Sequence, residues 1–263
     1  MYFEKYQATG NDFILFKEDI LNPKEVAIKV CDRHFGIGAD GILFPSQSTV
    51  SDIKMNYYNS DGSIAKMCGN GIRAFAKFVF LHQFVNKHQF TIETRAGIKT
   101  VTLESDDVLV DIGPSNLNVG NEFLTESING LTPYQFDQYE GYILSVGTLH
   151  TIVYLNDYEA LDPKRLAPRI QNDPIFKNQT NVNFVTILND HHIFVKTYER
   201  GAGWTLSCGT GVSASAYHAF KMGKVASNHV KVDVPGGKLN VMIETDKLYL
   251  KGPAVLVAKG EWL

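Results

Sequence analysis

Two cysteines could supply acid–base chemistry in this chain, because each lies in the same short motif before an apolar segment. The motif MCGNG spans residues 67–71 and precedes residues 72–80, and SCGTG spans residues 207–211 and precedes residues 212–220. Directly before a helix, free backbone N–H groups and the positive end of the helix dipole favour the thiolate of a cysteine. A thiolate can remove a proton. If the two thiols face one substrate carbon, one face can lose a proton while the opposite face gains one.

The glycines that follow each cysteine predict an anion-binding loop. Gly69-Asn70 and Gly209-Thr210 offer backbone N–H groups with little side chain in the way, so they could hold a substrate carboxylate and the charge that develops at its α-carbon. A single cysteine is more often a small packing residue. Duplication within matched glycine loops favours functional thiols at Cys68 and Cys208, whereas Cys31 has no counterpart and is expected to pack.

The interval between the two motifs indicates a duplicated fold. The cysteines are 140 residues apart (208 − 68), and the same offset aligns Phe80 with Phe220. Repetition over this length predicts two domains. We expect them to span residues 1–115 and 116–263, divided at a polar segment near residue 115, with the last strand a candidate to pack on the N-terminal domain.

Hydrophobic patterning predicts more strand than helix. The expected helices span residues 71–83 and 211–222, and both are apolar on most faces, as in a helix enclosed by sheet. Strands are expected where β-branched and apolar residues alternate with polar ones. The clearest are residues 90–94, 99–103, 108–112 and 193–198.

Composition favours a small-molecule enzyme. The formal net charge of −3, without a lysine or arginine block, argues against a nucleic-acid surface. No segment approaches the roughly 18 apolar residues of a membrane helix. Three cysteines without paired spacing fit free thiols in a reducing compartment, so we expect a cytoplasmic protein. The pattern GIGADG at residues 36–41 lacks the strand and helix of a dinucleotide site, and we expect neither cofactor nor metal.

The motifs together resemble those of the diaminopimelate epimerase family. NSDGS at residues 59–63 precedes the first cysteine motif, ERGAG at residues 199–203 precedes the second, and GNDF at residues 10–13 and NVNFV at residues 181–185 match as well. The resemblance implies the α+β class, with two pseudo-symmetric domains, each a curled, mainly antiparallel sheet wrapped around a central helix. It also implies a homodimeric, cofactor-independent isomerase that inverts an amino-acid α-carbon by a two-base mechanism.

The same resemblance assigns site residues by position. Cys68 and Cys208 would be the thiolate and thiol pair, and His150 and Glu199 would lie beside them and help to set their protonation. The far end of the substrate would be held by four further residues: Asn11, Asn59, Asn181 and Arg200. A guanidinium can bind a carboxylate through two hydrogen bonds, so Arg200 suits a dicarboxylate substrate, although it could also form a surface ion pair. Asn59 could instead be a turn residue.

Departures from the family leave the substrate open. Thr148 and Leu149 precede His150 where the family usually has asparagine and proline, and Trp204 replaces a common glutamate. The retained Arg200 favours epimerisation of LL- to meso-diaminopimelate. A remodelled pocket would favour racemisation of another amino acid, such as histidine, although the aromatic ring could simply fill a gap. A more distant alternative is a non-catalytic amino-acid-binding protein with inert thiols.

Overall fold

The computed structural model describes residues 1–156, 163–245 and 247–263. The chain divides into two compact units, one formed by residues 1–111 and 251–263 and the other by residues 112–250. The division falls four residues before the one expected from the polar segment (115 − 111). The C-terminal residues join the first unit because strand β19 (Val255–Glu261) pairs with β1 (Tyr2–Ala8).

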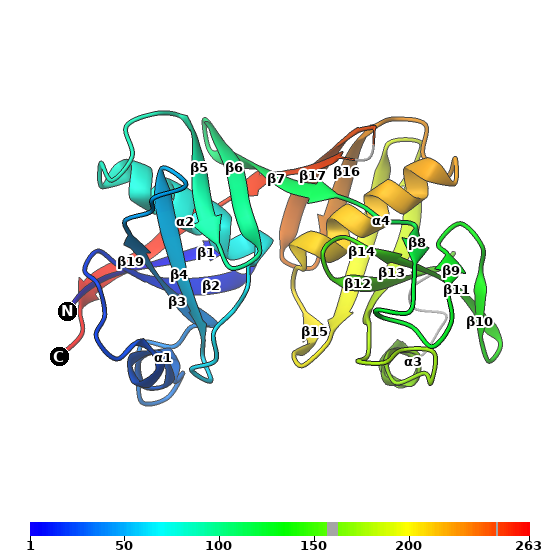
Figure 1. The fold of residues 1–263 in the computed structure, drawn as a ribbon, viewed down its shortest axis with the longest axis horizontal. Helices are drawn as coiled ribbons and strands as arrows, with labels where there is room; N and C mark the ends of the chain where they lie inside the picture. Colours follow the sequence, from blue (N-terminus) through cyan, green and yellow to red (C-terminus); the bar gives the residue numbers. More distant parts are fainter. Residues whose placement is uncertain (157–162, 246) are drawn as a thin grey trace. The chain divides into compact units, whose positions relative to one another are not determined.

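In the first unit, strands that pair in a fixed order surround one long helix, α2 (Figure 1). Strands β1 and β2 are antiparallel, β2 and β3 parallel, β3 and β4 antiparallel, β4 and β5 parallel, and β5 and β6 antiparallel. After β1, its elements are β2 Asn11–Phe16, α1 Pro23–Cys31, β3 Gly41–Ser46, β4 Ile53–Asn59, α2 Gly69–Leu81, β5 Gln89–Thr94, β6 Gly97–Glu104 and the first part of β7 Asp107–Pro114.

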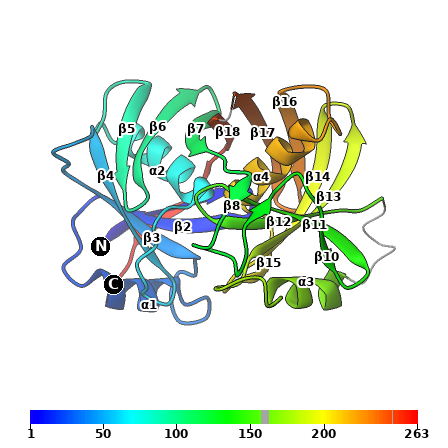
Figure 2. The ribbon, with the colours of Figure 1, turned by 45° about the vertical axis from the view of Figure 1, so that its right-hand side comes forward.

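The second unit repeats this pairing order around helix α4. Strands β11 and β12 are antiparallel, β12 and β13 parallel, β13 and β14 antiparallel, β14 and β16 parallel, and β16 and β17 antiparallel. Its elements after β7 are β8 Asn118–Val119, β9 Ile128–Asn129, β10 Tyr134–Phe136, β11 Tyr139–Ser145, β12 Leu149–Tyr154, α3 Pro163–Gln171, β13 Asn181–Asn189, β14 His192–Glu199, β15 Gly203–Thr205, α4 Gly209–Lys221, β16 His229–Val234, β17 Gly237–Glu244 and most of β18 Lys247–Pro253. The shorter helices pack outside this core, α1 on β3 and β4 and α3 on β13 (Figure 2).

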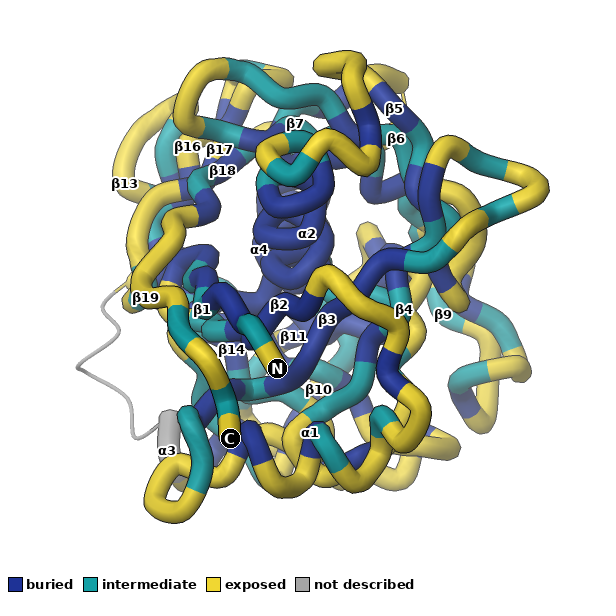
Figure 3. The backbone as a smooth tube through the Cα atoms, turned by 90° about the vertical axis from the view of Figure 1, so that its left-hand side faces the viewer, coloured by how far each residue is buried: buried dark blue, intermediate teal, exposed yellow. Residues whose placement is uncertain are grey.

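The two central helices are buried over most of their length (Figure 3). In the first unit α2 packs against β1, β2, β3 and β6, and in the second α4 packs against β12, β13, β14, β16 and β17. Each helix begins two residues before its predicted start because the preceding cysteine is the N-cap. The first bonds run from Ile72 N–H to the Cys68 carbonyl (2.9 Å) and from Val212 N–H to the Cys208 carbonyl (2.8 Å).

These elements confirm the α+β class and the sheet wrapped around a helix in each unit. All four strand segments chosen from the sequence lie within observed strands: β5, β6, β7 and β14. Among the helices in the described ranges, none is both long and apolar enough to cross a membrane. Helices α2 and α4 are apolar on most faces and pack against the strands of their own sheets.

Candidate active site

In the first unit Cys68 meets the start of β2. The cysteine is half-buried, in extended conformation (φ −135°, ψ 127°), and its Sγ–H donates to Asn11 Oδ1 at 3.5 Å. The Asn11 amide donates in turn to Asp40 Oδ2, which also accepts the Asp12 N–H at 3.0 Å. Asp40 therefore orients the amide that contacts Cys68. The sequence did not single out Asp40, although it lies in the GIGADG pattern at residues 36–41.

The loop after Cys68 is closely packed. Asn70 is buried, and its Oδ1 accepts a hydrogen bond from the Thr9 hydroxyl at 3.4 Å. A Cβ on Gly71 would lie 3.3 Å from the Phe13 ring, so this helix start has little spare room. Asn59, in contrast, donates to Ser63 Oγ at 2.9 Å within the turn that follows β4. This position fits the turn alternative. None of these hydrogen bonds links Asn59 to Cys68.

In the second unit Cys208 occupies the equivalent helix start but is buried more deeply. Burial raises its pKa well above the ordinary value, and the neighbouring Glu199 carboxylate raises it further through charge and a hydrogen bond. Bonds from the Thr210 hydroxyl and the Gly211 N–H oppose this change and are outweighed. The helix start alone predicts a lowered pKa, and that expectation is wrong for Cys208. Its sulfur is a thiol at neutral pH.

Glu199 is itself fixed at the end of β14. Its Oε1 accepts a hydrogen bond from the Thr205 hydroxyl on β15 at 2.6 Å, and Glu199 pairs with Gly203 across the same hairpin. This short hairpin brings the carboxylate to the helix start. The structure thus places Glu199, Thr210 and Cys208 together.

His150 lies at the centre of a buried polar network. Asn183 Nδ2 donates to His150 Nδ1 (3.1 Å), so the ring proton is on Nε2, which donates to Thr148 Oγ1 (3.0 Å). The Thr197 hydroxyl donates to Asn183 Oδ1 (3.0 Å), which fixes the orientation of that amide. Burial, reinforced by the charge of Arg200, lowers the pKa of His150 to about 3. His150 is therefore neutral near pH 7 and acts through hydrogen bonds.

The network is specific to the second unit. Strand register matches His150 with Phe13, because each pairs with the first residue of the parallel neighbouring strand: His150 with Asn181 and Phe13 with Gly41. The first unit therefore has an aromatic ring where the second has the imidazole. Asn183 belongs to the NVNFV motif, but the motif does not reveal its role, because its partners His150 and Thr197 lie on the neighbouring strands β12 and β14.

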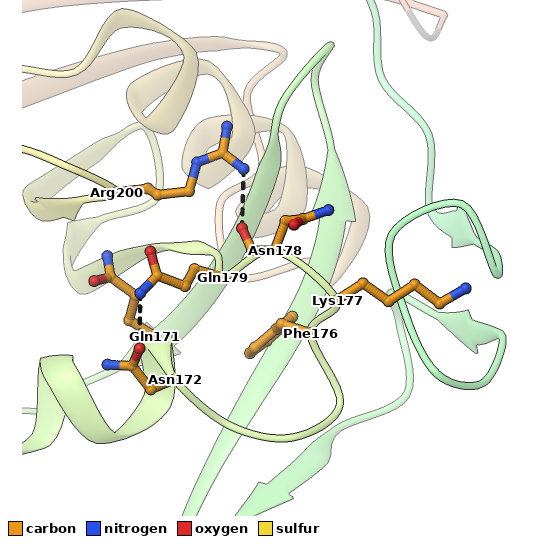
Figure 4. Close-up of a pocket in the computed structure, with 7 residues that line it drawn as sticks. All are labelled: Gln171, Asn172, Phe176, Lys177, Asn178, Gln179 and Arg200. Carbon is orange, nitrogen blue, oxygen red and sulfur yellow. Dashed lines mark hydrogen bonds between the residues drawn. The ribbon is translucent and has the colours of Figure 1, made fainter.

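Arg200 and Asn181 meet at this same end of β13, where Asn181 is the first residue of the strand. The Arg200 N–H donates to Asn181 Oδ1 (2.9 Å), and its Nη1 donates to the Asn178 carbonyl (3.0 Å). The guanidinium lines a cavity of about 670 Å³ (Figure 4). The lining is cationic and amide-rich: Gln171, Asn172, Phe176, Lys177, Asn178, Gln179 and Arg200. Such a lining suits a carboxylate.

Of the three departures from the family, Leu149 lies in the hydrophobic core of the second unit and Trp204 packs against that core. Leu149 is 5% exposed and belongs to a cluster with Phe184. Trp204 packs on that cluster, with its ring 5.8 Å from Phe184 and 5.3 Å from Tyr198. Thr148 bonds through its side chain to His150, whereas Leu149 contacts a candidate site residue only through its backbone, since its carbonyl accepts from Asn181 Nδ2 at 3.0 Å. The structure therefore favours the simpler alternative for Trp204, that the ring fills space.

Comparison with known proteins identifies the family of this chain. The sequence profile of the diaminopimelate epimerase family matches residues 3–118 and 142–257. The diaminopimelate epimerase of Alkaliphilus metalliredigens is 41% identical over 99% of this chain and 97% of its own length, and that of Methanothermobacter thermautotrophicus is 37% identical over 98% and 97%. The crystal structure of a Bacillus anthracis phenazine biosynthesis protein of the PhzF family has the same fold, with a TM-score of 0.73 at 17% identity over 100% of this chain and 99% of that one. The chain belongs to the diaminopimelate epimerase family.

Proposed function

We propose that this chain interconverts LL- and meso-diaminopimelate without a cofactor, using Cys68 and Cys208 as the two acid–base groups. As a member of the family it is an epimerase and thus an isomerase. In either direction of the reaction, the thiolate of one cysteine takes the α-proton. The thiol of the other cysteine then protonates the opposite face of the same carbon. The requirement that both sulfurs reach one α-carbon is part of the proposal.

The glycine loops supply the second part of the mechanism. Backbone N–H groups of Gly69-Asn70 and Gly209-Thr210 lie in the first turns of α2 and α4, where helices leave such groups unbonded. They would bind the α-carboxylate and stabilise the negative charge that grows when the proton leaves. His150, being neutral, would hold Thr148 in place through its Nε2–H rather than accept a proton.

The cationic cavity beside Arg200 is the observation that favours diaminopimelate. The far end of this substrate ends in a second carboxylate and amine, whereas histidine ends in a ring without negative charge. Arg200 and Lys177 both line the cavity, and the amides of Asn172, Asn178 and Gln179 line it as well. A carboxylate gains charge-assisted hydrogen bonds there that an imidazole cannot form. Asn181 would support this end by holding the Arg200 backbone.

The test is α-proton exchange in D₂O, followed by NMR, with LL-diaminopimelate, L-histidine and other L-amino acids offered separately under reducing conditions. We expect exchange with diaminopimelate. Arg200→Gln should lower kcat/KM about 10- to 150-fold, because a hydrogen bond to a charged group contributes about 1.5–3 kcal/mol and 1.4 kcal/mol is tenfold. Lys177→Met is the matched control: Lys177 lines the same cavity, but its Nζ donates to the Asn121 carbonyl and its side chain extends away from Arg200 (Figure 4), so kcat/KM should change less.

Three outcomes would contradict the proposal. Exchange with histidine but not with diaminopimelate would establish a racemase with a different pocket. Exchange with no amino acid would restore the binding-protein alternative. An Arg200→Gln variant that handles diaminopimelate as well as the wild type would remove Arg200 as the carboxylate anchor.

We further propose a cytoplasmic homodimer. The family resemblance implies the dimer, and strand β19 supports it by exposing three consecutive apolar side chains, Val255 (47%), Leu256 (40%) and Val257 (57%). Apolar residues gathered on one strand favour burial against a partner. Size-exclusion chromatography with light scattering should give about twice the mass of one chain, and Leu256→Lys should shift the protein toward monomer. A wild-type monomer at micromolar concentration would contradict the dimer.

A further inference from the structure

Arg73 is a buried cation one turn into helix α2. Its side chain is fully buried, and its hydrogen bonds run to neutral oxygens: Nη1 to the Gly69 carbonyl (2.9 Å), Nη2 to Thr9 Oγ1 (3.2 Å) and Nε to the Pro253 carbonyl (3.2 Å). Removing an ion from water is costly, so a buried guanidinium gains strongly from any negative charge nearby. A negatively charged group near Arg73 is therefore expected.

The cysteine at the start of the same helix is the foremost such charge. Burial lowers the pKa of Arg73 to about 10, while the negative charges of Cys68 and then Asp107 oppose that change. Arg73 thus remains protonated at neutral pH. Because charge interactions are reciprocal, the guanidinium stabilises the anionic form of Cys68 as the thiolate stabilises the guanidinium. Asp107 lies on β7 and interacts with Arg73 in the same way.

Several other ionisable groups packed around α2 have partners other than Cys68. At its C-terminal end, Glu4 on β1 accepts from Tyr6 and contacts His82 Nε2 at 3.0 Å. On β2, Asp12 is bonded to Lys5 and Arg33. Lys77 on α2 donates to the Asp106 carbonyl, and Glu104 on β6 pairs with Lys251 at 2.8 Å. Lys99 is a further ionisable residue on β6. Arg73 is the cation placed one turn from Cys68.

One contact works against ionisation of Cys68. In its thiol form Sγ–H donates to Asn11 Oδ1 at 3.5 Å, and this bond is lost with the proton. A thiol is a weak donor and the acceptor is neutral, so the loss is small beside the attraction of two opposite charges in a buried setting.

The internal repeat shows that this cation belongs to one half only. The 140-residue offset aligns Arg73 with Ser213 (213 − 73), and Ser213 Oγ donates to the Gly209 carbonyl at 2.9 Å, just as Arg73 Nη1 donates to that of Gly69. The same carbonyl thus receives a charged donor in one half and a neutral hydroxyl in the other. Beside Cys208 the ionisable neighbour is instead the carboxylate of Glu199. The two halves surround equivalent cysteines with opposite charge.

We propose that Arg73 is a positioning residue for charge, which holds Cys68 as the thiolate in the resting enzyme while Cys208 starts as the thiol. This inference rests on the proposed function and specifies the protonation state of the two cysteines before substrate binds. The Cys68 thiolate takes the α-proton and becomes a thiol, the substrate carbanion takes the proton of Cys208, and Cys208 becomes the thiolate. Cys68 then loses its proton to water and Cys208 takes one from water, which restores the resting form. Arg73 favours the first change and Glu199 favours the second.

The experiment measures thiolate directly, without substrate. In a Cys208→Ser background, the rate of Cys68 alkylation by iodoacetamide is followed by mass spectrometry from pH 5 to pH 10. Cys31 does not interfere because burial raises its pKa to about 12. The wild-type Arg73 protein should give a midpoint well below the value of about 8.5 for a free cysteine. Arg73→Met should raise the midpoint by at least about one pH unit, equivalent to a tenfold loss of thiolate at neutral pH.

Two matched variants separate charge from packing. Arg73→Lys retains a cation and should keep the midpoint near that of the parent, whereas Ser213→Ala, at the equivalent position of the other half, should leave it unchanged. An unchanged midpoint in folded Arg73→Met would overturn the proposal. If that variant does not fold, a parent midpoint at or above 8.5 overturns it equally. Since no substrate is present, these results stay distinct from failure of the epimerase activity itself.

Discussion

Trp204 offers the sharpest test of whether the departures from the family reshape the substrate pocket or only its surroundings. Its indole lies 5.3 Å from the Tyr198 ring in an edge-on contact and 5.8 Å from the Phe184 ring, and Lys196 Nζ lies 5.1 Å above it. Each aromatic pair contributes about 0.5–1.5 kcal/mol, and an exposed cation–π contact contributes about 0.5–1 kcal/mol. Trp204→Ala should therefore lower the free energy of unfolding of the second unit by about 1.5–4 kcal/mol.

The repeat supplies a control at the equivalent hairpin of the first unit. Ile64 bridges to Tyr58 as Trp204 pairs with Tyr198, yet Ile64 is 47% exposed. Ile64→Ala should change stability by no more than about 0.5 kcal/mol. Urea unfolding followed by far-UV circular dichroism measures both variants, and α-proton exchange under native conditions measures their substrate preference.

A packing role for Trp204 predicts lost stability with unchanged preference. The ratio of exchange rates for diaminopimelate and histidine should stay within about threefold of the wild type in Trp204→Ala, a change of less than 1 kcal/mol in discrimination. Trp204→Glu should destabilise the unit further, because a carboxylate would meet an apolar cluster. Unchanged stability together with a tenfold shift toward diaminopimelate in Trp204→Glu would refute this reasoning and establish a pocket residue.

Three further predictions address the second unit. Gly211→Ala should destabilise it by about 1–3 kcal/mol, because the new Cβ would overlap Asn183 Oδ1, whereas Gly71→Ala, at the equivalent position, meets the Phe13 ring at 3.3 Å and should cost less; equal urea midpoints for the two would contradict this. Glu199→Gln should lower the pKa of Cys208 and move its alkylation to lower pH in a Cys68→Ser background, with Glu199→Asp as the charge-retaining control; an upward shift would show that the carboxylate favours the thiolate. Acidification should weaken the unit, because burial lowers the pKa of His150 to about 3 and that of His218 to about 4, while an unfolded histidine titrates near 6.5. The unfolded chain therefore binds more protons between these values, and stability falls as pH falls, by about 2 kcal/mol per histidine at pH 5. A urea midpoint that stays constant from pH 7 to pH 5 would contradict this, and His218→Gln should remove about half of the loss.

Local patterning was sufficient to predict the main elements. Helices α2 and α4 are apolar on most faces, and alternating residues mark β5, β6, β7 and β14, so the period of the sequence alone indicates their type. The repeated cysteine motifs identify the family, because the glycine loops and the residues around them are short, contiguous and specific. The start of each helix was missed by two residues because a cysteine is an uncommon N-cap.

Long-range contacts decided what the sequence could not. The pKa of Cys208 depends on burial and on a carboxylate from the β14–β15 hairpin, and that of His150 depends on burial and on Arg200. Both effects require distances between segments far apart in the chain, which no spacing along the sequence reveals. The same holds for Asn183, whose partners lie on β12 and β14, and for Trp204, whose ring turns to the core. The sequence by itself determined the family and predicts which residues carry the chemistry, whereas the tertiary structure decided the surroundings that set their protonation, because charge and solvation depend on neighbours in space.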